Sequence, residues 1–227
     1  MRNVLLAIFS HRSLALIRWD LHFIKVRFLN LLFKRDRVVD SFIKRGGTRY
    51  LNLGSGPRGI DDEQWLNIDG YPDRSVHYLC DFSRSIPVPP STLDGIFTEH
   101  VLEHFDIENG RKLLLKCHDM LKEGGVVRII VPDGRRILKR YFEEPESIIR
   151  YRECQTGCAM EAVNSWFHQR YEHQFIYDAD VLGHILKEVG FRNVRQAGYM
   201  STEFGAESLL LDDRKYEWES LYMEAMK

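Results

Sequence analysis

A glycine-rich segment, Gly54-Ser-Gly-Pro-Arg-Gly59, follows directly after a short apolar run that ends at Leu53. Glycines at this spacing let the backbone turn sharply and approach a ligand that a Cβ would exclude, so the segment predicts a nucleotide-type cofactor loop. Several kinds of nucleotide-binding fold share this spacing. Pro57 removes an N–H that would grip a pyrophosphate, and this argues against a dinucleotide.

Two aspartates, Asp69 and Asp81, end the next two predicted strands. Ligands of α/β sheets bind outside the carboxyl ends of the strands, where Asp69 suits ribose hydroxyls and Asp81 suits an adenine amino group. Asp69 comes only fifteen residues after Gly54, a shorter spacing than that of the ribose-binding acid in NAD folds. Taken singly, each aspartate would also suit a turn or a helix N-cap, but both together favour the ligand interpretation.

Ionisable side chains are concentrated in Glu99-His-Val-Leu-Glu-His104, which contains His100-x-x-Glu103-His104. This order matches the inverted zinc-protease motif, in which histidines four residues apart share one helix face. A zinc peptidase needs a long helix here and a third ligand downstream, and neither is evident, so we expect no metal site. His104 is a candidate for orienting the loop or facing a substrate, and each histidine would also suit a partly buried loop position.

A second cluster, Glu172-His173, follows a group of aromatic and histidine side chains: Trp166, Phe167, His168 and Tyr171. Aromatic groups with polar tips suit a sugar or a planar substrate. They are equally ordinary as core residues, so both interpretations remain open.

The elements that must position these residues alternate between strand and helix. Strands are predicted at 49–53, 65–69, 76–80, 95–98 and 126–131, with a final strand pair at 194–199 and 221–226. Helices are predicted at 108–121, ended by Gly124-Gly125, over most of 133–166 with an interruption at Pro145, and at 179–189, ended by Gly190. Strands separated by helices predict a mainly parallel sheet with helices on both faces.

Residues 1–45 differ from the rest of the chain. They carry ten Lys or Arg and three Asp or Glu, a net charge of +7, whereas the remaining residues carry −8. An apolar stripe at three- and four-residue steps predicts an amphipathic helix; its members are Leu14, Ile17, Leu21, Ile24, Phe28 and Leu31. We therefore divide the chain into a basic helical extension, 1–45, and a main domain, 46–227.

Two interpretations of the extension remain open. It would pack on the body as a lid or a dimer contact, or it would lie on an anionic membrane surface as an amphipathic anchor. Its longest apolar run, Val4–Phe9, is too short to span a bilayer. The sequence does not predict an oligomeric state.

Composition bounds the remaining possibilities. The four cysteines are few and scattered, which predicts unpaired thiols, including Cys154 and Cys158, and a reducing cytoplasm. No convincing signal-peptide cleavage site follows the first apolar run. Nucleic-acid binding is not expected, because the body is acidic and the basic residues are confined to the apolar extension.

Five motifs together resemble, in order, those of class I (Rossmann-like) S-adenosylmethionine-dependent methyltransferases: Tyr50–Gly56, Leu66–Asp69, Cys80-Asp81, Ile96–His104 and Leu121–Asp133. The resemblance implies a doubly wound α/β fold with a seven-stranded, mostly parallel sheet whose last strand is antiparallel. The tail, with His173, Gly190-Phe191 and Leu221–Ala225, resembles a bacterial subgroup associated with surface-polysaccharide genes.

The resemblance also implies S-adenosyl-L-methionine as the cofactor and assigns its site to residues at the strand ends. These are Asn52, Gly54, Ser55, Gly56, Asp69, Gly70, Asp81, Phe82, Glu99 and His100. Asn52 departs from the family pattern, in which an acid faces the methionine amino group. Its amide oxygen still accepts a hydrogen bond but provides no charge.

These observations favour a methyltransferase that moves a methyl group to a hydroxyl, or another nucleophile, of a small molecule or glycan precursor. A hydroxyl acceptor would benefit from a base, for which His104, His173 and Asp133 are the candidates. The alternative is a non-catalytic Rossmann-like module tethered at a membrane surface or in a complex. An NAD-dependent enzyme is disfavoured by the spacing of Asp69.

Overall fold

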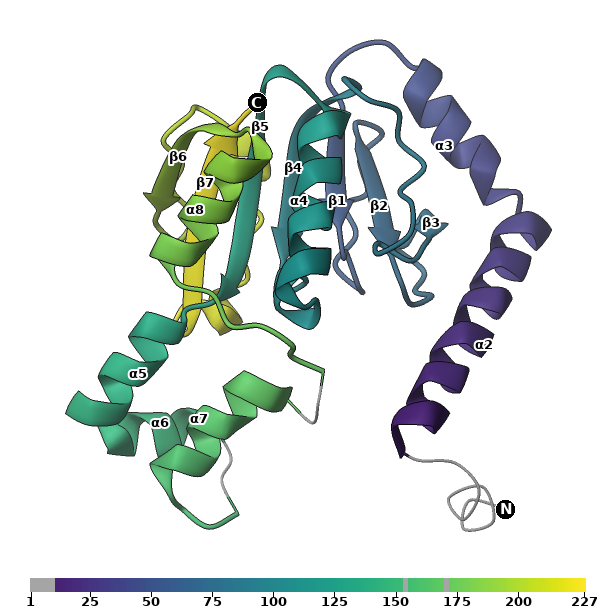
Figure 1. Cartoon of the computed structure of the whole chain (residues 1–227). Helices are drawn as coiled ribbons and strands as arrows, with labels where there is room; N and C mark the ends of the chain where they lie inside the picture. The colour runs from purple at the N-terminus through teal and green to yellow at the C-terminus, as the bar shows by residue number, and fades with distance from the viewer. Residues whose placement is uncertain (1–10, 153–154, 170–171) are drawn as a thin grey trace.

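The computed structural model describes residues 11–152, 155–169 and 172–227, and its centre is one seven-stranded sheet in the order β3-β2-β1-β4-β5-β7-β6 (Figure 1). The strands are β1 (Tyr50–Leu53), β2 (Trp65–Asp69), β3 (Tyr78–Leu79), β4 (Leu93–Glu99), β5 (Leu121–Pro132), β6 (Arg192–Ala197) and β7 (Ser220–Met226). Only β7 runs antiparallel to its neighbours, β5 and β6. The expected mostly parallel sheet with an antiparallel last strand is confirmed.

The helices flank this sheet and extend beyond its carboxyl edge. They are α2 (His11–Leu32), α3 (Arg35–Lys44), α4 (Ile107–Met120), α5 (Gly134–Glu143), α6 (Pro145–Tyr151), α7 (Ala159–His168) and α8 (Ala179–Val189), with short 3-10 turns η1 (Leu102–His104), η3 (Glu207–Leu209) and η4 (Arg214–Tyr216). The mostly helical stretch predicted over 133–166 is three helices, and the predicted interruption at Pro145 separates the first two. Pro145 lacks the N–H that would continue α5, and it begins α6 instead.

The sheet has two faces of different character. One is packed by α3, α4 and α8, and Figure 1 shows α4 and α8 lying across it. The other carries Trp65, Phe97 and Ile130 and is covered by the segment 198–211, which includes η3. The expected layer of long helices is therefore found on one face, while this segment covers the second.

The start of β5 differs from the prediction. Helix α4 ends at Met120, and Leu121 is already in the sheet, where it pairs with Leu93. The glycines expected to end the helix lie within the strand instead, and Gly124 has a φ of +77°. Leu121 is fully buried, so the chain enters the sheet as soon as the helix ends, and the glycines form the irregular pairing that follows.

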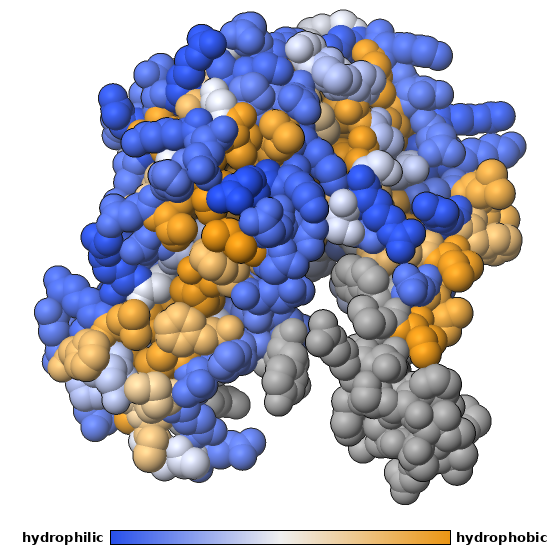
Figure 2. Space-filling view, in the orientation of Figure 1, coloured by the Kyte–Doolittle hydropathy of each residue, from blue (hydrophilic) through white to orange (hydrophobic). Residues whose placement is uncertain are grey.

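The N-terminal helix α2 packs on the body through a face other than the predicted one. Phe23 and Val26 contact Val76 and Leu79 beside β3. The members of the predicted stripe whose exposure the structure describes all face away from the body: Ile17, Leu21, Ile24, Phe28 and Leu31 are 42–72% exposed. Figure 2 shows apolar (orange) surface on the right of the molecule, where Figure 1 places α2 and α3. The run Val4–Phe9 lies outside the described residues.

Three further observations concern the helices, the extension and the cysteines. Among the described residues no helix is both long and apolar enough to cross a membrane. Helix α3 contributes Val39 and Phe42 to the main core. Cys80, Cys117 and Cys158 are unpaired, and Cys154 lies outside the described residues.

Candidate functional site

The glycine loop after β1 has the conformation that its sequence predicted. Gly54 has a φ of +80°, and a Cβ added there would lie 2.1 Å from Cγ2 of Val101. Its N–H donates to the carbonyl of Ile68 at 2.9 Å, which ties the turn to β2. Gly56 has a φ of +49°, and none of the described atoms lies within 4 Å of an added Cβ. The loop therefore requires glycine at 54 and leaves open space above Gly56.

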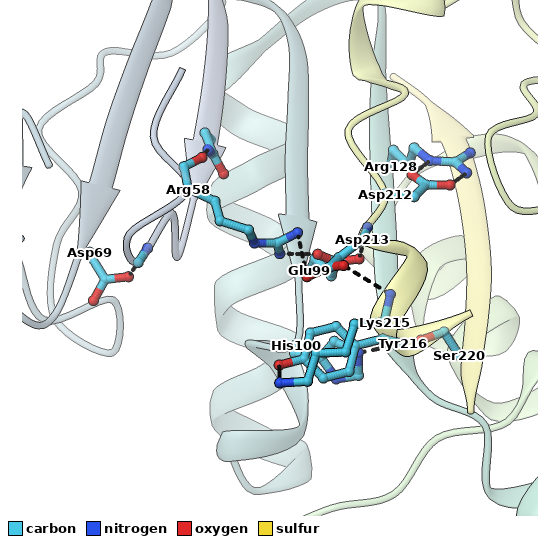
Figure 3. Close-up of polar contacts among 12 residues, drawn as sticks. Arg58, Asp69, Glu99, His100, Arg128, Asp212, Asp213, Lys215, Tyr216 and Ser220 are labelled. Carbon is cyan, nitrogen blue, oxygen red and sulfur yellow. Dashed lines mark hydrogen bonds and ion pairs between the residues drawn. The ribbon is translucent and has the colours of Figure 1, made fainter. Parts of the chain in front are cut away.

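Asp69 joins this loop to the next one (Figure 3). Its Oδ2 accepts a hydrogen bond from the N–H of Gly56 at 2.8 Å, and its Oδ1 accepts one from the N–H of Tyr71 at 2.7 Å. The carboxylate is only partly buried. Because a carboxylate oxygen has capacity for more than one donor, Asp69 can still accept from a ligand hydroxyl.

The other predicted cofactor residues lie along the same carboxyl edge. Asn52 is buried and its Nδ2 donates to the carbonyl of Arg58 at 3.2 Å, so it also supports the glycine loop. Gly70 accepts a hydrogen bond from the His22 ring of α2 at 2.7 Å. Asp81 accepts from the backbone N–H and the hydroxyl of Ser83 and pairs with Arg84 at 3.2 Å. The Phe82 ring is buried in the main core.

Two hydroxyls at this edge are buried without a hydrogen-bond partner among the described residues, Ser55 Oγ and Thr98 Oγ1. Buried hydroxyls are normally paired, so unpaired ones beside a glycine loop point to a polar ligand. Together with the open space above Gly56 and the carboxylate of Asp69, they fit an adenosyl cofactor with ribose hydroxyls. The residues present are thus compatible with the expected cofactor.

Arg58, which the sequence analysis did not assign to the site, crosses from the glycine loop to β4 (Figure 3). Its guanidinium forms an ion pair with the buried carboxylate of Glu99 and a second, at 3.3 Å, with Asp213. Glu99 also accepts a hydrogen bond from the backbone N–H of Asp213 at 2.9 Å. Arg58 lies inside the predicted glycine motif, and this position could have identified it as a site residue.

Beyond the end of β4 lies a polar cavity of about 450 Å³. One wall is formed by the turn that carries His100, Glu103 and His104. The other walls come from the segments around Tyr151 and His173 and from the 215–219 segment. Of the predicted catalytic residues, the fold thus brings His104 and His173 together, with ring centroids 5.0 Å apart.

Asp133 is held elsewhere. Its carboxylate accepts a hydrogen bond from the N–H of Arg136 at 3.0 Å and caps the N-terminus of α5. It is absent from the described residues that line the cavity. The N-cap interaction accounts for its position after β5.

His100 and Glu103 form a buried pair at the cavity wall. Nδ1 of His100 lies 2.9 Å from Oε1 of Glu103 and its Nε2 lies 3.3 Å from Oγ of Ser220. Burial alone lowers the pKa of His100, but the hydrogen bond to Glu103 and the charges of Glu103 and Glu219 raise it above its ordinary value. Burial alone raises the pKa of Glu103, and the histidine overcomes this and lowers it.

His104 and His173 are both oriented by backbone carbonyls. Nδ1 of His104 lies 3.1 Å from the carbonyl oxygen of Glu172, and Nδ1 of His173 lies 2.5 Å from that of Trp166. A carbonyl only accepts hydrogen bonds, so in the neutral form of each ring Nδ1 carries the hydrogen and Nε2 keeps its lone pair. Burial lowers the pKa of His173, which favours its neutral form.

The 215–219 wall is anchored by a buried ion triad on the second face of the sheet. Arg128 is fully buried and binds Asp212 through two hydrogen bonds, at 2.7 and 2.5 Å (Figure 3). It also binds Glu224 at 2.7 Å. Its remaining donors bind the carbonyls of Gly198 and Ser201. Asp212 directly precedes Asp213, so the triad holds the segment that leads to Lys215 and Tyr216.

We expect the histidines of the cavity to titrate on opposite sides of the ordinary value, His100 above it and His173 below it. Replacing Glu103 by Gln should lower the pKa of His100, because burial is then no longer offset by the charge of Glu103. Imidazole NMR titration of the full chain in metal-free buffer measures the pKa values of His100 and His173. Unchanged titration of His100 in Glu103→Gln would contradict the pairing.

The same shifts fix a pH window for stability. A raised folded pKa for His100 gives stabilisation that is complete below its ordinary value of 6.5 and is lost as pH rises through the raised pKa. A lowered folded pKa for Glu103 gives stabilisation present above its ordinary value of 4.5 and lost as pH falls through the lowered pKa. The pair thus stabilises the fold most between these two values.

Comparison with known proteins gives a family match and structural neighbours. The sequence profile of a family described as a methyltransferase domain matches residues 34–196. A SAM-dependent methyltransferase from Archaeoglobus fulgidus is similar in structure, with a TM-score of 0.50, 18% identity, and coverage of 87% of this chain and 94% of that chain.

A chain from the complex between the Trm112 methyltransferase activator and its methyltransferase partner of Haloferax volcanii also has a TM-score of 0.50, with 11% identity and coverage of 88% and 92%. At these identities the structures show a shared fold. No curated protein sequence matches the chain.

Proposed function

The chain belongs to the methyltransferase domain family and is an enzyme that uses S-adenosyl-L-methionine, and we propose that it transfers the methyl group to a hydroxyl of a small molecule or glycan precursor. The observation that carries the proposal is the polar cavity at the end of β4, which is lined by two histidines whose Nδ1 atoms are held by backbone carbonyls. The cavity adjoins Glu99 and His100, at the end of the strand next to the glycine loop.

We assign the cofactor to the glycine loop and the strand ends that follow it. Asp69 would accept hydrogen bonds from the ribose hydroxyls, and the backbone of Gly54–Gly56 would lie against the ligand without a Cβ between them. Ser55 and Thr98 offer buried hydroxyls. When bound, the cofactor supplies an activated sulfonium methyl group, so the protein's own task is to position the acceptor and to manage its proton.

We assign the acceptor to the cavity. Its lining combines imidazoles and carboxylates with the rings of Tyr151 and Tyr216. Rings with polar tips suit a sugar, and this agrees with the resemblance to a subgroup associated with surface polysaccharides. A hydroxyl acceptor would give its proton to Nε2 of His173 or His104 as the oxygen is methylated. The unpaired cysteines are consistent with a cytoplasmic reaction.

Methyl-labelled cofactor tests the nature of the acceptor. Each of a set of sugars would be offered together with its amino-sugar analogue, and the labelled products would be located by mass spectrometry. We expect label on hydroxyl oxygen, and we expect His173→Gln to reduce the rate while leaving cofactor binding unchanged. Transfer to nitrogen alone would refute the hydroxyl proposal.

We propose a peripheral membrane contact for α2. Its inner face contacts the body, where Phe23 packs beside β3 and His22 bonds to Gly70, while its outer face exposes Leu21, Ile24 and Phe28 by 59–64%. The extension carries a net charge of +7. An apolar face flanked by basic residues favours an anionic lipid surface.

Sedimentation with vesicles of phosphatidylglycerol and phosphatidylethanolamine tests this contact. The double variant Leu21→Glu, Phe28→Glu should bind at least about tenfold less, because each change removes an apolar group that would insert into the bilayer and adds a charge of the same sign as the lipid. Both side chains are exposed, so the fold should be retained. The matched control is Leu115→Glu, an exposed leucine on α4. Equal sedimentation of all three proteins would remove the proposal.

A further inference from the structure

A cluster at the cavity wall brings together Glu103, His104 and His173, with one potential ligand atom of each lying within 4.8 Å of the others. We propose that these three side chains bind one divalent transition-metal ion of the Zn²⁺ type. We expected no metal from the sequence because a third ligand was not evident. The fold supplies it from His173, and the partners of His104 are Glu103 and His173 rather than His100.

The buried carboxylate of Glu103 favours a bound cation. Glu103 is completely buried, and its Oε1 is held by Nδ1 of His100 at 2.9 Å. Its Oε2 is buried with no hydrogen-bond partner among the described residues. An unpaired buried carboxylate oxygen is costly, and a bound cation would compensate it. His100 would then orient a ligand, as outer partners do in metal sites.

The orientation of His104 and His173 is typical of metal ligands. Each donates its Nδ1 hydrogen to a backbone carbonyl, of Glu172 for His104 and of Trp166 for His173. This leaves the Nε2 lone pair of each ring available. Metal-binding histidines characteristically donate their other ring N–H to a carbonyl or carboxylate, which fixes the tautomer and the ring orientation.

The backbone around the cluster is also held in place. The N–H of Gln174 donates to the carbonyl of Glu103 at 2.8 Å, and its side-chain Nε2 donates to the carbonyl of His104 at 2.9 Å. These bonds join two segments that are far apart in the sequence. Two imidazoles and one carboxylate facing an open cavity match the ligand set of catalytic zinc sites, which keep one position for water or substrate.

The chemical role of such a site rests on the proposed function. A hydroxyl bound at the open position is more acidic than a free one. Its proton would pass to water, its oxygen would form the bond to the methyl carbon, and the carbon–sulfur bond of the sulfonium would break with its electron pair on sulfur. In this form His104 and His173 act as ligands, and the ion replaces the base.

Calorimetric titration of the metal-free full chain with ZnCl₂, without cofactor or acceptor, tests the site. We expect one Zn²⁺ per chain, and binding at least about tenfold weaker in Glu103→Gln and in His104→Ala. The matched control is His184→Ala, which removes a histidine of α8 whose side chain is 70% exposed, and it should bind as the wild type does.

Two further readouts separate this inference from a folding defect and from the proposed function. Unfolding midpoints would show that the variants remain folded, and His104 is partly exposed, so its replacement should be tolerated. Zn²⁺ should shift the imidazole NMR signals of His104 and His173 and leave that of His184 in place. Absence of stoichiometric binding, or equal affinity in folded His104→Ala, overturns the metal site and leaves the methyltransferase assignment intact.

Discussion

Replacing Gly54 by Ala should reduce the affinity for S-adenosyl-L-methionine by about 100-fold, close to 2.7 kcal/mol. The new Cβ would lie 2.1 Å from Cγ2 of Val101, and the φ of +80° is unfavourable for any residue with a side chain. Overpacking costs about 1–3 kcal/mol and a left-handed non-glycine residue about 1–2 kcal/mol. The loop should relieve this strain by leaving its binding conformation. Isothermal calorimetry measures the affinity.

A double variant separates the two causes. Gly54→Ala with Val101→Ala removes the colliding methyl group and should recover about tenfold of the lost affinity, while the backbone strain remains. The control for a harmless glycine change is Gly46→Ala, where an added Cβ meets none of the described atoms within 4 Å. If Gly54→Ala binds the cofactor as tightly as Gly46→Ala, the assignment of the loop is wrong.

Replacing Arg128 by Met should destabilise the protein by about 3–5 kcal/mol, because it leaves two buried carboxylates without their counter-ion. Asp212 and Glu224 are held close to one guanidinium, and both are buried. Urea denaturation followed by circular dichroism measures the change in the free energy of unfolding. Loss of the anchored segment should also reduce methyl transfer, because Lys215 and Tyr216 line the cavity.

A matched variant at the surface tests whether burial causes this effect. Arg135→Met removes an arginine that also pairs with two aspartates, Asp178 and Asp180, but at the exposed surface. Exposed pairs contribute little, so this variant should unfold with the wild-type midpoint. Equal destabilisation by Arg128→Met and Arg135→Met would refute the claim that burial makes the Arg128 ion pairs important.

Local patterns in the sequence were sufficient to predict much of the fold. The glycine loop follows a strand and Asp69 ends the next one, as expected from turn chemistry and strand order. The helix at 179–189 was predicted with its bounds, because apolar spacing and a terminal Gly190 with a φ of +114° both mark it. These features depend on residues that are close together in the chain.

Other features depend on contacts that no local pattern encodes. Arg128 meets Asp212 and Glu224 across 84 and 96 residues, and nothing near Arg128 in the sequence indicates a buried cation. His104 meets His173 in the same way. The exposure of the apolar stripe on α2 could not be predicted either. Hydrophobic spacing identifies an apolar stripe but does not indicate whether the body covers it.

S-adenosyl-L-methionine should bind at the glycine loop Gly54–Gly59 and at Asp69, the last residue of β2. Parallel calorimetric titrations of the wild-type chain with S-adenosyl-L-methionine and with NAD test it most directly. The structure predicts one molecule of S-adenosyl-L-methionine per chain, weakened binding in Asp69→Ala, and no heat with NAD. Absence of binding up to about 1 mM S-adenosyl-L-methionine, or saturable binding of NAD in its place, would contradict the account.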